Sequence, residues 1–282
     1  MTFFLEGELS AAERGPDARF RVIPVPLERT VSWGSGTAAG PAAIIEASVE
    51  LERRTAGVEP CAKGILTEPA VDCTGPLPAV MERIAARTEA AVRAGAVPVA
   101  LGGEHALTYG AALGVARALG RPLGIVQIDA HADLRRAYRG ERHSHASVMQ
   151  LLAEEEGMAL AQFGVRALCG EEEALRRRLG VFHVDAERLV TEGCHEVDLP
   201  EAFPRDVYVS FDVDGLDPAV MPATGTPVPG GLSFYQALHL VEHALDGRRC
   251  AGIDVVELAP DGAAAWPFTA AQLTYRLMAA AG

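Results

Sequence analysis

The stretch LGIVQIDAHAD, residues 123–133, constrains the fold of this chain more than any other feature. Its first part, 123–128, is mostly apolar and β-branched, and a glycine and a proline stand just before it. This pattern predicts a strand that is buried on both faces, as in a parallel sheet. The strand ends in three ligand-type side chains at alternate positions, Asp129, His131 and Asp133. Because alternate residues of an extended backbone project to one side, these three side chains could converge on a single point.

Two carboxylates and an imidazole at the end of a buried strand are costly unless something compensates their charge. A divalent cation would do so, and the stretch therefore favours a metal site. The alternative interpretation is a polar turn at which the strand reaches the surface.

The composition limits the possible partners. The chain has 282 residues, of which 49% are hydrophobic, and a formal net charge of −13. That charge argues against nucleic acid and against an anionic membrane surface as partners, and it mildly favours a small cationic molecule. Lys63 is the only lysine, which excludes a P-loop and a Schiff-base lysine elsewhere in the chain.

The cysteines and the N-terminus indicate a cytoplasmic location. The five cysteines are scattered and form no C-x-x-C pair, as expected of thiols in a reducing compartment. The N-terminus, MTFFLEGELS, has no basic region and does not resemble a signal peptide. No apolar run approaches the 18 residues or so that a membrane-spanning helix needs.

Hydrophobic periodicity predicts alternating strands and helices after a loose polar arm at 1–19, with an irregular segment at 57–78. Strands are expected at 20–25, 97–101, 123–128, 162–166, 181–184, 206–213 and 251–258. Helices are expected from 41, at 79–94 and 106–119, from about 146, and at 171–179, 233–245 and 269–281. This alternation predicts a three-layer α/β/α fold with a mainly parallel sheet, and we interpret residues 1–282 as a single domain.

Ligand-type residues follow three of these strands. They are His105, then Asp129, His131 and Asp133, and then Asp212 and Asp214. The carboxyl ends of parallel strands line one edge of the sheet, so all six should meet there. Four aspartates that close together could not all remain ionised without cations, and two histidines with four carboxylates match a two-metal site. A donor set rich in oxygen and free of thiolate favours Mn²⁺ over Zn²⁺.

Four motifs in order resemble the arginase/agmatinase superfamily of ureohydrolases. They are GGEH at 102–105, DAHAD at 129–133, SFDVDGLDP at 210–218 and DVVEL at 254–258. The resemblance extends over roughly residues 22–280 and implies the arginase-like fold.

The resemblance implies two Mn²⁺ ions per chain. One would be held by His105, Asp129, Asp133 and Asp212, and the other by His131, Asp129, Asp212 and Asp214, so that Asp129 and Asp212 bridge the two ions.

The resemblance also implies catalytic roles. A hydroxide between the metals would attack the guanidinium carbon, with Asp133 handling its proton. Glu257 would pair with the guanidinium, for which a bidentate anion is the natural partner. His145 would pass a proton to the departing amine, although His143 stands close enough in sequence to compete for that role. Glu257 could instead be a structural acid paired to an arginine.

Agmatine is the expected substrate, and urea and putrescine would be the products, as in polyamine biosynthesis. Arg135 stands where arginases usually carry an asparagine that binds the amino-acid head, and LRRAYRGERHSHASVM resembles a branch of the agmatinases. The alternatives are a guanidino-acid hydrolase or an arginase, since Arg135 or Arg136 in the pocket would attract a carboxylate. The family also implies a homo-oligomer, a trimer or a hexamer.

Other motifs have ordinary explanations. Gly34, Gly36 and Ala39 fit a dinucleotide-binding pattern loosely, and we interpret them as part of a flexible entrance loop. His239 to His243 fits H-x-x-E-H, a zinc-protease pattern, but a solvated helix face explains it better. His183 and His195 lie away from the acidic clusters and are expected to be ordinary histidines. Two further alternatives are a single-zinc, deacetylase-like hydrolase and a catalytically silent homologue.

Overall fold

The computed structural model describes residues 2–282. Eight strands form one sheet in the order β2-β1-β3-β8-β7-β4-β5-β6. The strands are β1 (Phe20–Val25), β2 (Ile65–Thr67), β3 (Val97–Gly102), β4 (Gly124–Ile128), β5 (Ala159–Phe163), β6 (Phe182–Val184), β7 (Asp206–Asp212) and β8 (Arg249–Val256). All neighbouring strands in this sheet pair in parallel.

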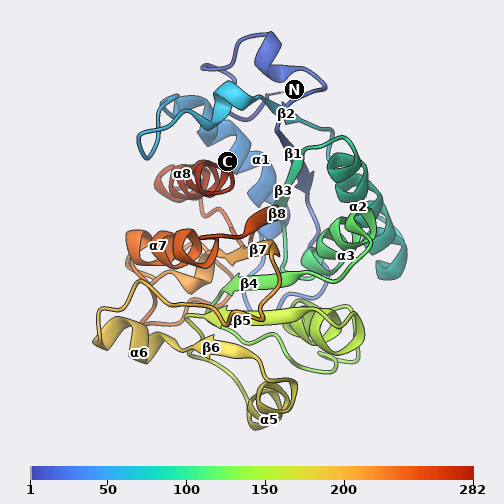
Figure 1. Ribbon diagram of the computed structural model, residues 1–282, viewed down its shortest axis with the longest axis vertical. Helices are drawn as coiled ribbons and strands as arrows, with labels where there is room; N and C mark the ends of the chain where they lie inside the picture. Colours follow the sequence, from blue (N-terminus) through green and yellow to red (C-terminus); the bar gives the residue numbers. More distant parts are fainter. Residues whose placement is uncertain (1) are drawn as a thin grey trace.

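Helices cover both faces of the sheet, as parallel strands require (Figure 1). They are α1 (Gly40–Ala47), α2 (Leu77–Arg93), α3 (Leu107–Leu119), α4 (Val148–Gln150), α5 (Gly170–Leu179), α6 (Ala186–Thr191), α7 (Phe234–Ala244) and α8 (Ala265–Ala280). The helices α1, α7 and α8 lie on one face, and α2 and α3 lie on the other. The expected three-layer α/β/α architecture is confirmed.

Two hydrophobic cores lie on the two faces of the sheet, and the sequence of β7 shows why. Val207, Val209 and Phe211 pack in the core beneath α7 and α8, whereas Tyr208 packs in the core beneath α2 and α3. All residues of β7 are buried. A strand that is apolar at successive positions therefore has a partner layer for each face.

The N-terminal arm differs from the expectation. The sequence predicts a loose arm at 1–19, but the side chains of Phe4 and Leu5 are fully buried. The Phe4 and Leu5 N–H groups donate to the hydroxyls of Thr67 and Ser48, respectively. The prediction is wrong because the segment carries few apolar residues, and these few complete the core at the β2 edge of the sheet.

Three shorter elements also differ from the prediction. The segment 57–78, expected to be irregular, contains the edge strand β2, and α6 is not predicted by the sequence pattern. These elements have only 3 and 6 residues, too few for a clear period. Strand β5 ends at Phe163, three residues earlier than expected, because Gly164 takes a φ of +90° that ends the extended backbone.

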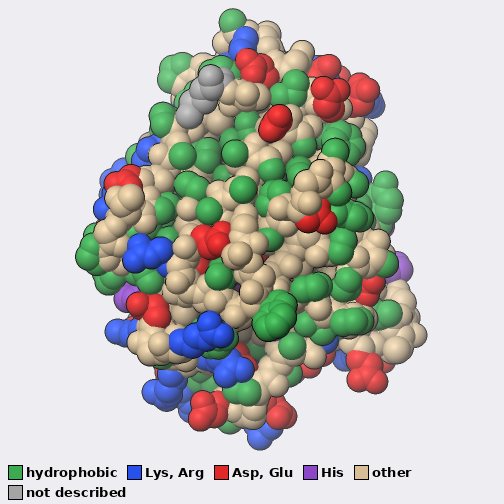
Figure 2. All heavy atoms as spheres, turned by 180° about the vertical axis from the view of Figure 1, so that it is seen from behind, with side chains coloured by type: hydrophobic (Ala, Val, Ile, Leu, Met, Phe, Trp, Pro, Cys, Tyr) green, Lys and Arg blue, Asp and Glu red, His purple; other side chains and the backbone are tan. Residues whose placement is uncertain are grey.

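The surface around α5 is strongly charged. The helix begins with three acidic residues and ends with three arginines, which complements its dipole. Figure 2 shows acidic and basic side chains close together at the lower end of the molecule, where Figure 1 places α5. Within residues 2–282, no helix is long and apolar enough to cross a membrane.

The strand order places β3, β8, β7 and β4 side by side in the middle of the sheet. The loops that leave these four strands at their carboxyl ends carry the predicted site residues. The candidate site therefore lies at the centre of one sheet edge.

Candidate active site

Two groups of metal-ligand side chains lie at this edge of the sheet. One consists of His105, Asp129 and Asp212, and the other of Asp129, His131 and Asp214, with the ligand atoms of each group within 4.8 Å of one another. Asp129 is common to both groups. The structure thus brings together, on one sheet edge, residues from three widely separated parts of the sequence.

The first group surrounds the imidazole of His105. Its Nδ1 lies 3.1 Å from Asp129 Oδ2, 3.0 Å from Asp133 Oδ2 and 3.4 Å from Asp212 Oδ2. His105 is 1% exposed. Asp133, the fourth residue predicted for this set, therefore lies beside the His105 imidazole together with Asp129 and Asp212.

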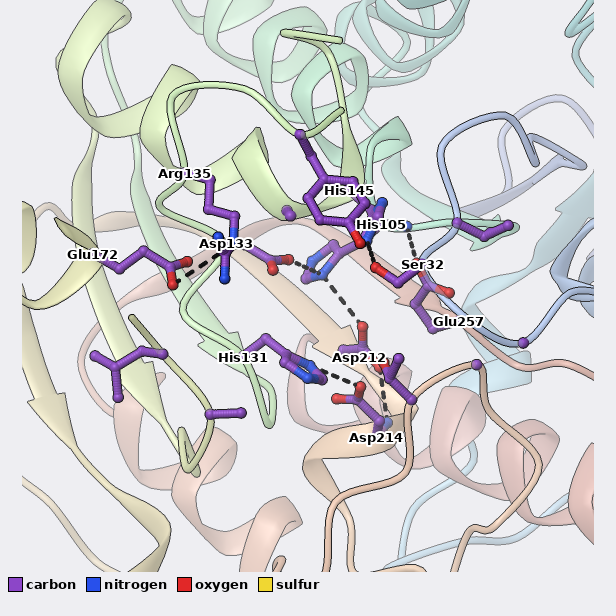
Figure 3. A pocket seen from close by; sticks show the side chains of 18 of the residues that line it. Ser32, His105, His131, Asp133, Arg135, His145, Glu172, Asp212, Asp214 and Glu257 are labelled. Carbon is purple, nitrogen blue, oxygen red and sulfur yellow. Dashed lines mark hydrogen bonds and ion pairs between the residues drawn. The ribbon is translucent and has the colours of Figure 1, made fainter. Parts of the chain in front are cut away.

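The second group surrounds His131. Its Nδ1 lies 3.0 Å from Asp214 Oδ2 and 3.6 Å from Asp129 Oδ1. The two oxygens of Asp129 thus face different histidines, Oδ2 toward His105 and Oδ1 toward His131. This is the arrangement that a bridging carboxylate needs. Figure 3 shows His131, Asp212 and Asp214 converging from two loops.

Burial and crowding shift the pKa of the carboxyl groups. Burial, with the neighbouring Asp129, raises the pKa of Asp133 to about 7. Burial, with Asp214 and Asp129, raises the pKa of Asp212 well above its ordinary value. Burial opposes the charged form of His131, but Asp129 and Asp214 outweigh it and raise the His131 pKa to about 12. The carboxyl groups therefore resist ionisation, and the His131 imidazole holds its proton. These shifts are expected of a cation site in which protein groups must balance one another's charge.

A buried hydrogen-bond chain orients the imidazole of His105. Its Nε2 lies 2.8 Å from Ser210 Oγ, and that hydroxyl donates to Asp254 Oδ1 at 2.8 Å. Since the only hydroxyl proton goes to the carboxylate, Nε2 must donate its own proton to Ser210. The other ring nitrogen, Nδ1, is buried and faces only carboxylate oxygens, so its lone pair is available to a cation when the ring is neutral. This set of oxygen and imidazole donors fits a divalent metal.

Backbone strain accompanies two site residues. Asp133 and Glu257 have positive φ angles, of 53° and 66°, which non-glycine residues rarely adopt. Both side chains line the same pocket. Strained conformations persist where the surroundings over-determine them, and function is the usual reason.

Glu257 lies on the loop after β8 and faces the cavity. Its Oε1 accepts the backbone N–H of His105 at 2.7 Å, and its own N–H donates to the Gly103 carbonyl at 2.9 Å. Burial raises the pKa of Glu257 to about 8. No arginine within residues 2–282 pairs with this carboxylate, so the alternative of a structural ion pair has no support.

His145 lines the cavity from the other side. Its ring nitrogens lie 3.0 Å from Thr30 Oγ1 and 2.8 Å from Ser32 Oγ. Burial, with the nearby His105 and His131, lowers the pKa of His145 to about 4. His143 instead packs edge-on against Tyr109, outside the set of described residues that line the cavity.

The cavity has a volume of about 380 Å³, and Arg135 and Glu172 line it on the side of Asp133 that faces away from Glu257 (Figure 3). Glu172 is 3% exposed and accepts the N–H groups of Leu134 and Cys169. Arg135 Nε lies 3.9 Å from Glu172 Oε2, and the Arg135 side chain is 44% exposed.

Glu172 is a site residue that the sequence pattern does not indicate. It stands in the run GEEEALRRR, which has the composition of a solvated helix face. Only its position three residues into α5, where it caps the helix and faces inward, brings it to the cavity. Thr30 and Ser32, which hold His145, lie on the entrance loop and carry no individual signal either.

The H-x-x-E-H pattern has an ordinary explanation. His243 pairs with Asp198, and Glu242 pairs with Arg276. The ring of His239 lies beside that of His195, with centroids 6.0 Å apart. The part of the chain that the structure describes contains two clusters with metal-ligand geometry, and neither includes these residues. His183 is hydrogen-bonded to the Val181 carbonyl, as expected of an ordinary histidine.

Comparison with known proteins identifies the family. The family model described as Arginase family matches residues 18–280. The chain belongs to the arginase family. The N(1)-aminopropylagmatine ureohydrolase of Thermus thermophilus is 38% identical, over 94% of this chain and 91% of its own length. The agmatinase of Pyrococcus horikoshii is 34% identical, over 87% of this chain and 85% of its own.

A solved structure agrees as well. The agmatine ureohydrolase of Thermoplasma volcanium superposes with a TM-score of 0.82 at 29% identity, covering 95% of this chain and 92% of its own. The protein is therefore an arginase-family ureohydrolase, a hydrolase of guanidino compounds.

Proposed function

We propose that this ureohydrolase binds two Mn²⁺ ions and cleaves an agmatine-type substrate, either agmatine or agmatine with a further aminopropyl group, to urea and an amine. The observation that supports it best is the convergence of the two metal-ligand groups with Glu257 in one cavity. The relatives named for agmatine and N(1)-aminopropylagmatine support the choice of substrate.

The two ions, when bound, would act as Lewis acids that lower the pKa of water at the site. Glu257 binds the guanidinium, because its carboxylate faces the cavity and a planar cation needs a bidentate anionic partner. Asp133 accepts the proton of the attacking water. His145, whose lowered pKa keeps its ring neutral, relays a proton to the leaving amine, and Thr30 and Ser32 hold its ring in place.

The end of the cavity that Arg135 and Glu172 line favours a cationic tail. The buried Glu172 carboxylate is fixed by two backbone N–H donors, whereas the half-exposed Arg135 can turn toward solvent. The negative charge of Glu172 therefore stays at this end of the cavity, whereas the positive charge of Arg135 can move away. An ammonium group of the substrate can replace the Arg135 guanidinium beside Glu172.

The same arginine gives the alternative of a guanidino-acid substrate a specific basis. Arg135 lines the cavity and could grip a carboxylate, whereas Arg136 is exposed and lies 4.0 Å from Glu154. Arg136→Ala is therefore a matched control for Arg135→Ala.

The test is urea release from agmatine, N(1)-aminopropylagmatine, arginine and guanidinobutyrate after Mn²⁺ loading. For an agmatine-type substrate, Arg135→Ala should spare or improve kcat/KM, and Arg136→Ala should leave it unchanged. A lost bidentate contact to a carboxylate costs roughly 2–5 kcal/mol, a drop of about thirtyfold or more. A wild-type preference for guanidinobutyrate that disappears in Arg135→Ala would overturn the choice of substrate.

We propose that residues 1–282 act as one ureohydrolase domain, that the chain forms a trimer or a hexamer, and that it works in the cytoplasm in polyamine biosynthesis. The charge of −13 supports a cationic substrate over an anionic partner.

A further inference from the structure

A chain of three buried polar side chains leads from α5 to the ligand that the two metal groups share. Gln127 on β4 and Gln162 on β5 are directly paired neighbours in the sheet, and both are fully buried. Arg176 on α5 is 3% exposed and also pairs with Asp185. The sequence pattern assigns none of the three to the site.

The contacts run in one line. Arg176 Nε donates to Gln162 Oε1 at 2.9 Å, and Gln162 Nε2 donates to Gln127 Oε1 at 2.6 Å. Gln127 Nε2 then donates to Asp129 Oδ2 at 2.6 Å. The same two amides also donate to the carbonyls of the DAHAD loop, Gln162 to Ala132 and Gln127 to His131.

The direction of this chain is forced by its ends. A guanidinium can only donate, so the oxygen of Gln162 must face Arg176 and its NH₂ group must face Gln127. The oxygen of Gln127 is then occupied, and its NH₂ group must face Asp129. A carboxylate only accepts hydrogen bonds, so Asp129 at one end and Arg176 at the other require the same orientation of the two glutamine amides. The amide assignments thus follow from chemistry and do not depend on the choice of flip.

We propose that Gln127, Gln162 and Arg176 are positioning residues, which orient Asp129 and the loop 129–133 for the two metals. The inference rests on the proposed binuclear site. Asp129 must direct one carboxylate oxygen toward each of the two metal-ligand groups. A carboxylate that could rotate freely would not keep its two oxygens directed in this way. The N–H donor from Gln127 on Oδ2 and the His131 backbone N–H on Oδ1 together fix its rotation, and Arg176, through Gln162, fixes the Gln127 amide.

The variant Gln162→Glu tests this chain of hydrogen bonds at a residue whose side chain contacts no metal-ligand side chain. The introduced carboxylate would still accept from Arg176 but could not donate to Gln127. The Gln127 amide would then turn its NH₂ toward this carboxylate and present its oxygen to Asp129. If the side chains only support packing, the stronger pair with Arg176 should leave metal binding unchanged.

The measurement is the Mn²⁺ affinity of the full-length protein, from the EPR signal of free Mn²⁺ during titration, together with the spin-coupled signal of the loaded site. Loss of an outer-shell partner typically costs about 10- to 100-fold in metal affinity. We expect a loss in that range for Gln162→Glu, with a weakened spin-coupled signal. Gln127→Met, which removes the donor itself, should show a similar loss, and the double variant should lose no more than Gln127→Met alone.

Gln236→Glu is the matched control. Gln236 on α7 also donates its amide to two carbonyls, those of Leu189 and Cys194, but it lies outside this chain of contacts. It should lower the melting temperature without changing Mn²⁺ affinity. Wild-type Mn²⁺ affinity in both Gln162→Glu and Gln127→Met, or an equal loss in Gln236→Glu, would overturn the inference. If Gln162→Glu does not fold, Gln127→Met against Gln236→Glu decides the question.

The outcome separates this inference from the proposed function. A wild-type protein that binds no second Mn²⁺ would refute the binuclear site itself. A wild-type protein that binds two, with both glutamine variants unaffected, would refute only the positioning role.

Discussion

At the scale of single residues, Asp129 is the position on which the site depends most. Its two oxygens face His105 and His131, and it belongs to both metal-ligand groups. His131, in contrast, belongs to one group and is the most exposed of the metal-ligand side chains, at 28%. Substitutions at Asp129 and at His131 should therefore differ in how many of the two metals they weaken.

Asp129→Asn should abolish activity and weaken both metals, because it removes an anionic oxygen from each group. His131→Asn should loosen mainly one metal. Calorimetric titration with Mn²⁺ would distinguish these outcomes, with two weakened sites for the first variant and one for the second. Asp212→Asn is expected to resemble Asp129→Asn if Asp212 also bridges. Near-normal turnover with two metals bound in Asp129→Asn would contradict the bridging role.

The pKa values predict how the metal-free protein responds to pH. The pKa of Asp133 is raised from 3.8 to about 7, and that of Glu257 from 4.5 to about 8. At a pH between the ordinary and the raised pKa of each group, the unfolded chain has released a proton that the folded chain still holds. The contribution of these two groups to stability in EDTA should therefore fall as the pH rises from about 4.5 to about 8.

Bound Mn²⁺ should reverse this trend, because the metal displaces those protons and binds more tightly as the pH rises. The measurement is the melting temperature with EDTA and with Mn²⁺ across this range. Glu257→Gln stays neutral at every pH and should flatten part of the EDTA curve. A wild-type melting temperature in EDTA that instead rises with pH would show that these raised pKa values do not govern stability.

At the scale of elements, the loops at the carboxyl ends of four strands build the site, and the N-terminal arm closes the core far from it. Phe4 is fully buried and packs near Tyr275 of α8, with ring centroids 6.4 Å apart. Trp33 on the entrance loop is 90% exposed. Phe4 and Trp33 therefore allow a buried and an exposed aromatic side chain to be compared in the same protein.

Phe4→Ala should lower the free energy of unfolding by about 3–5 kcal/mol, the usual cost of emptying a buried aromatic site. Trp33→Ala should change it by less than about 0.5 kcal/mol, because little of its surface is buried. Urea denaturation of the two variants measures both values. Equal, small effects would mean that the arm does not belong to the folded core.

At the scale of the whole molecule, the sheet order decides how many ligands meet. The adjacent strands β3, β8, β7 and β4 bring His105, Glu257, Asp212 and Asp129 to one edge. A single-zinc, deacetylase-like site would not need this full set. The number of metals per chain is thus the global property that separates the alternatives.

Elemental analysis of the Mn²⁺-reconstituted protein should give two metals per chain. Removal of the metal should abolish urea release, and free Mn²⁺ at about 100 times its dissociation constant should stabilise the fold by about 2.7 kcal/mol for each site. A plateau at one metal per chain would favour the single-metal alternative.

The layered fold, and the convergence of the candidate ligand residues at one sheet edge, could be predicted from residue order, because both follow from local patterns. A strand that is apolar at successive positions, as in GIVQI, needs cover on both faces, and alternate acidic and imidazole residues directly after it have few explanations other than a metal site. The positions of β3, β4 and β7 and the residues at their ends were predictable for this reason.

The remaining features became visible only in the folded chain, because they depend on contacts distant in sequence. The burial of Phe4 requires the far end of the chain, and the arrival of Glu172 at the cavity requires the docking of α5. Arg176, Gln162 and Gln127 are ordinary as sequence and form a directed chain only when β4, β5 and α5 are assembled. A hydrogen bond depends on distance and direction between two groups, and residue order does not contain either until the chain has folded.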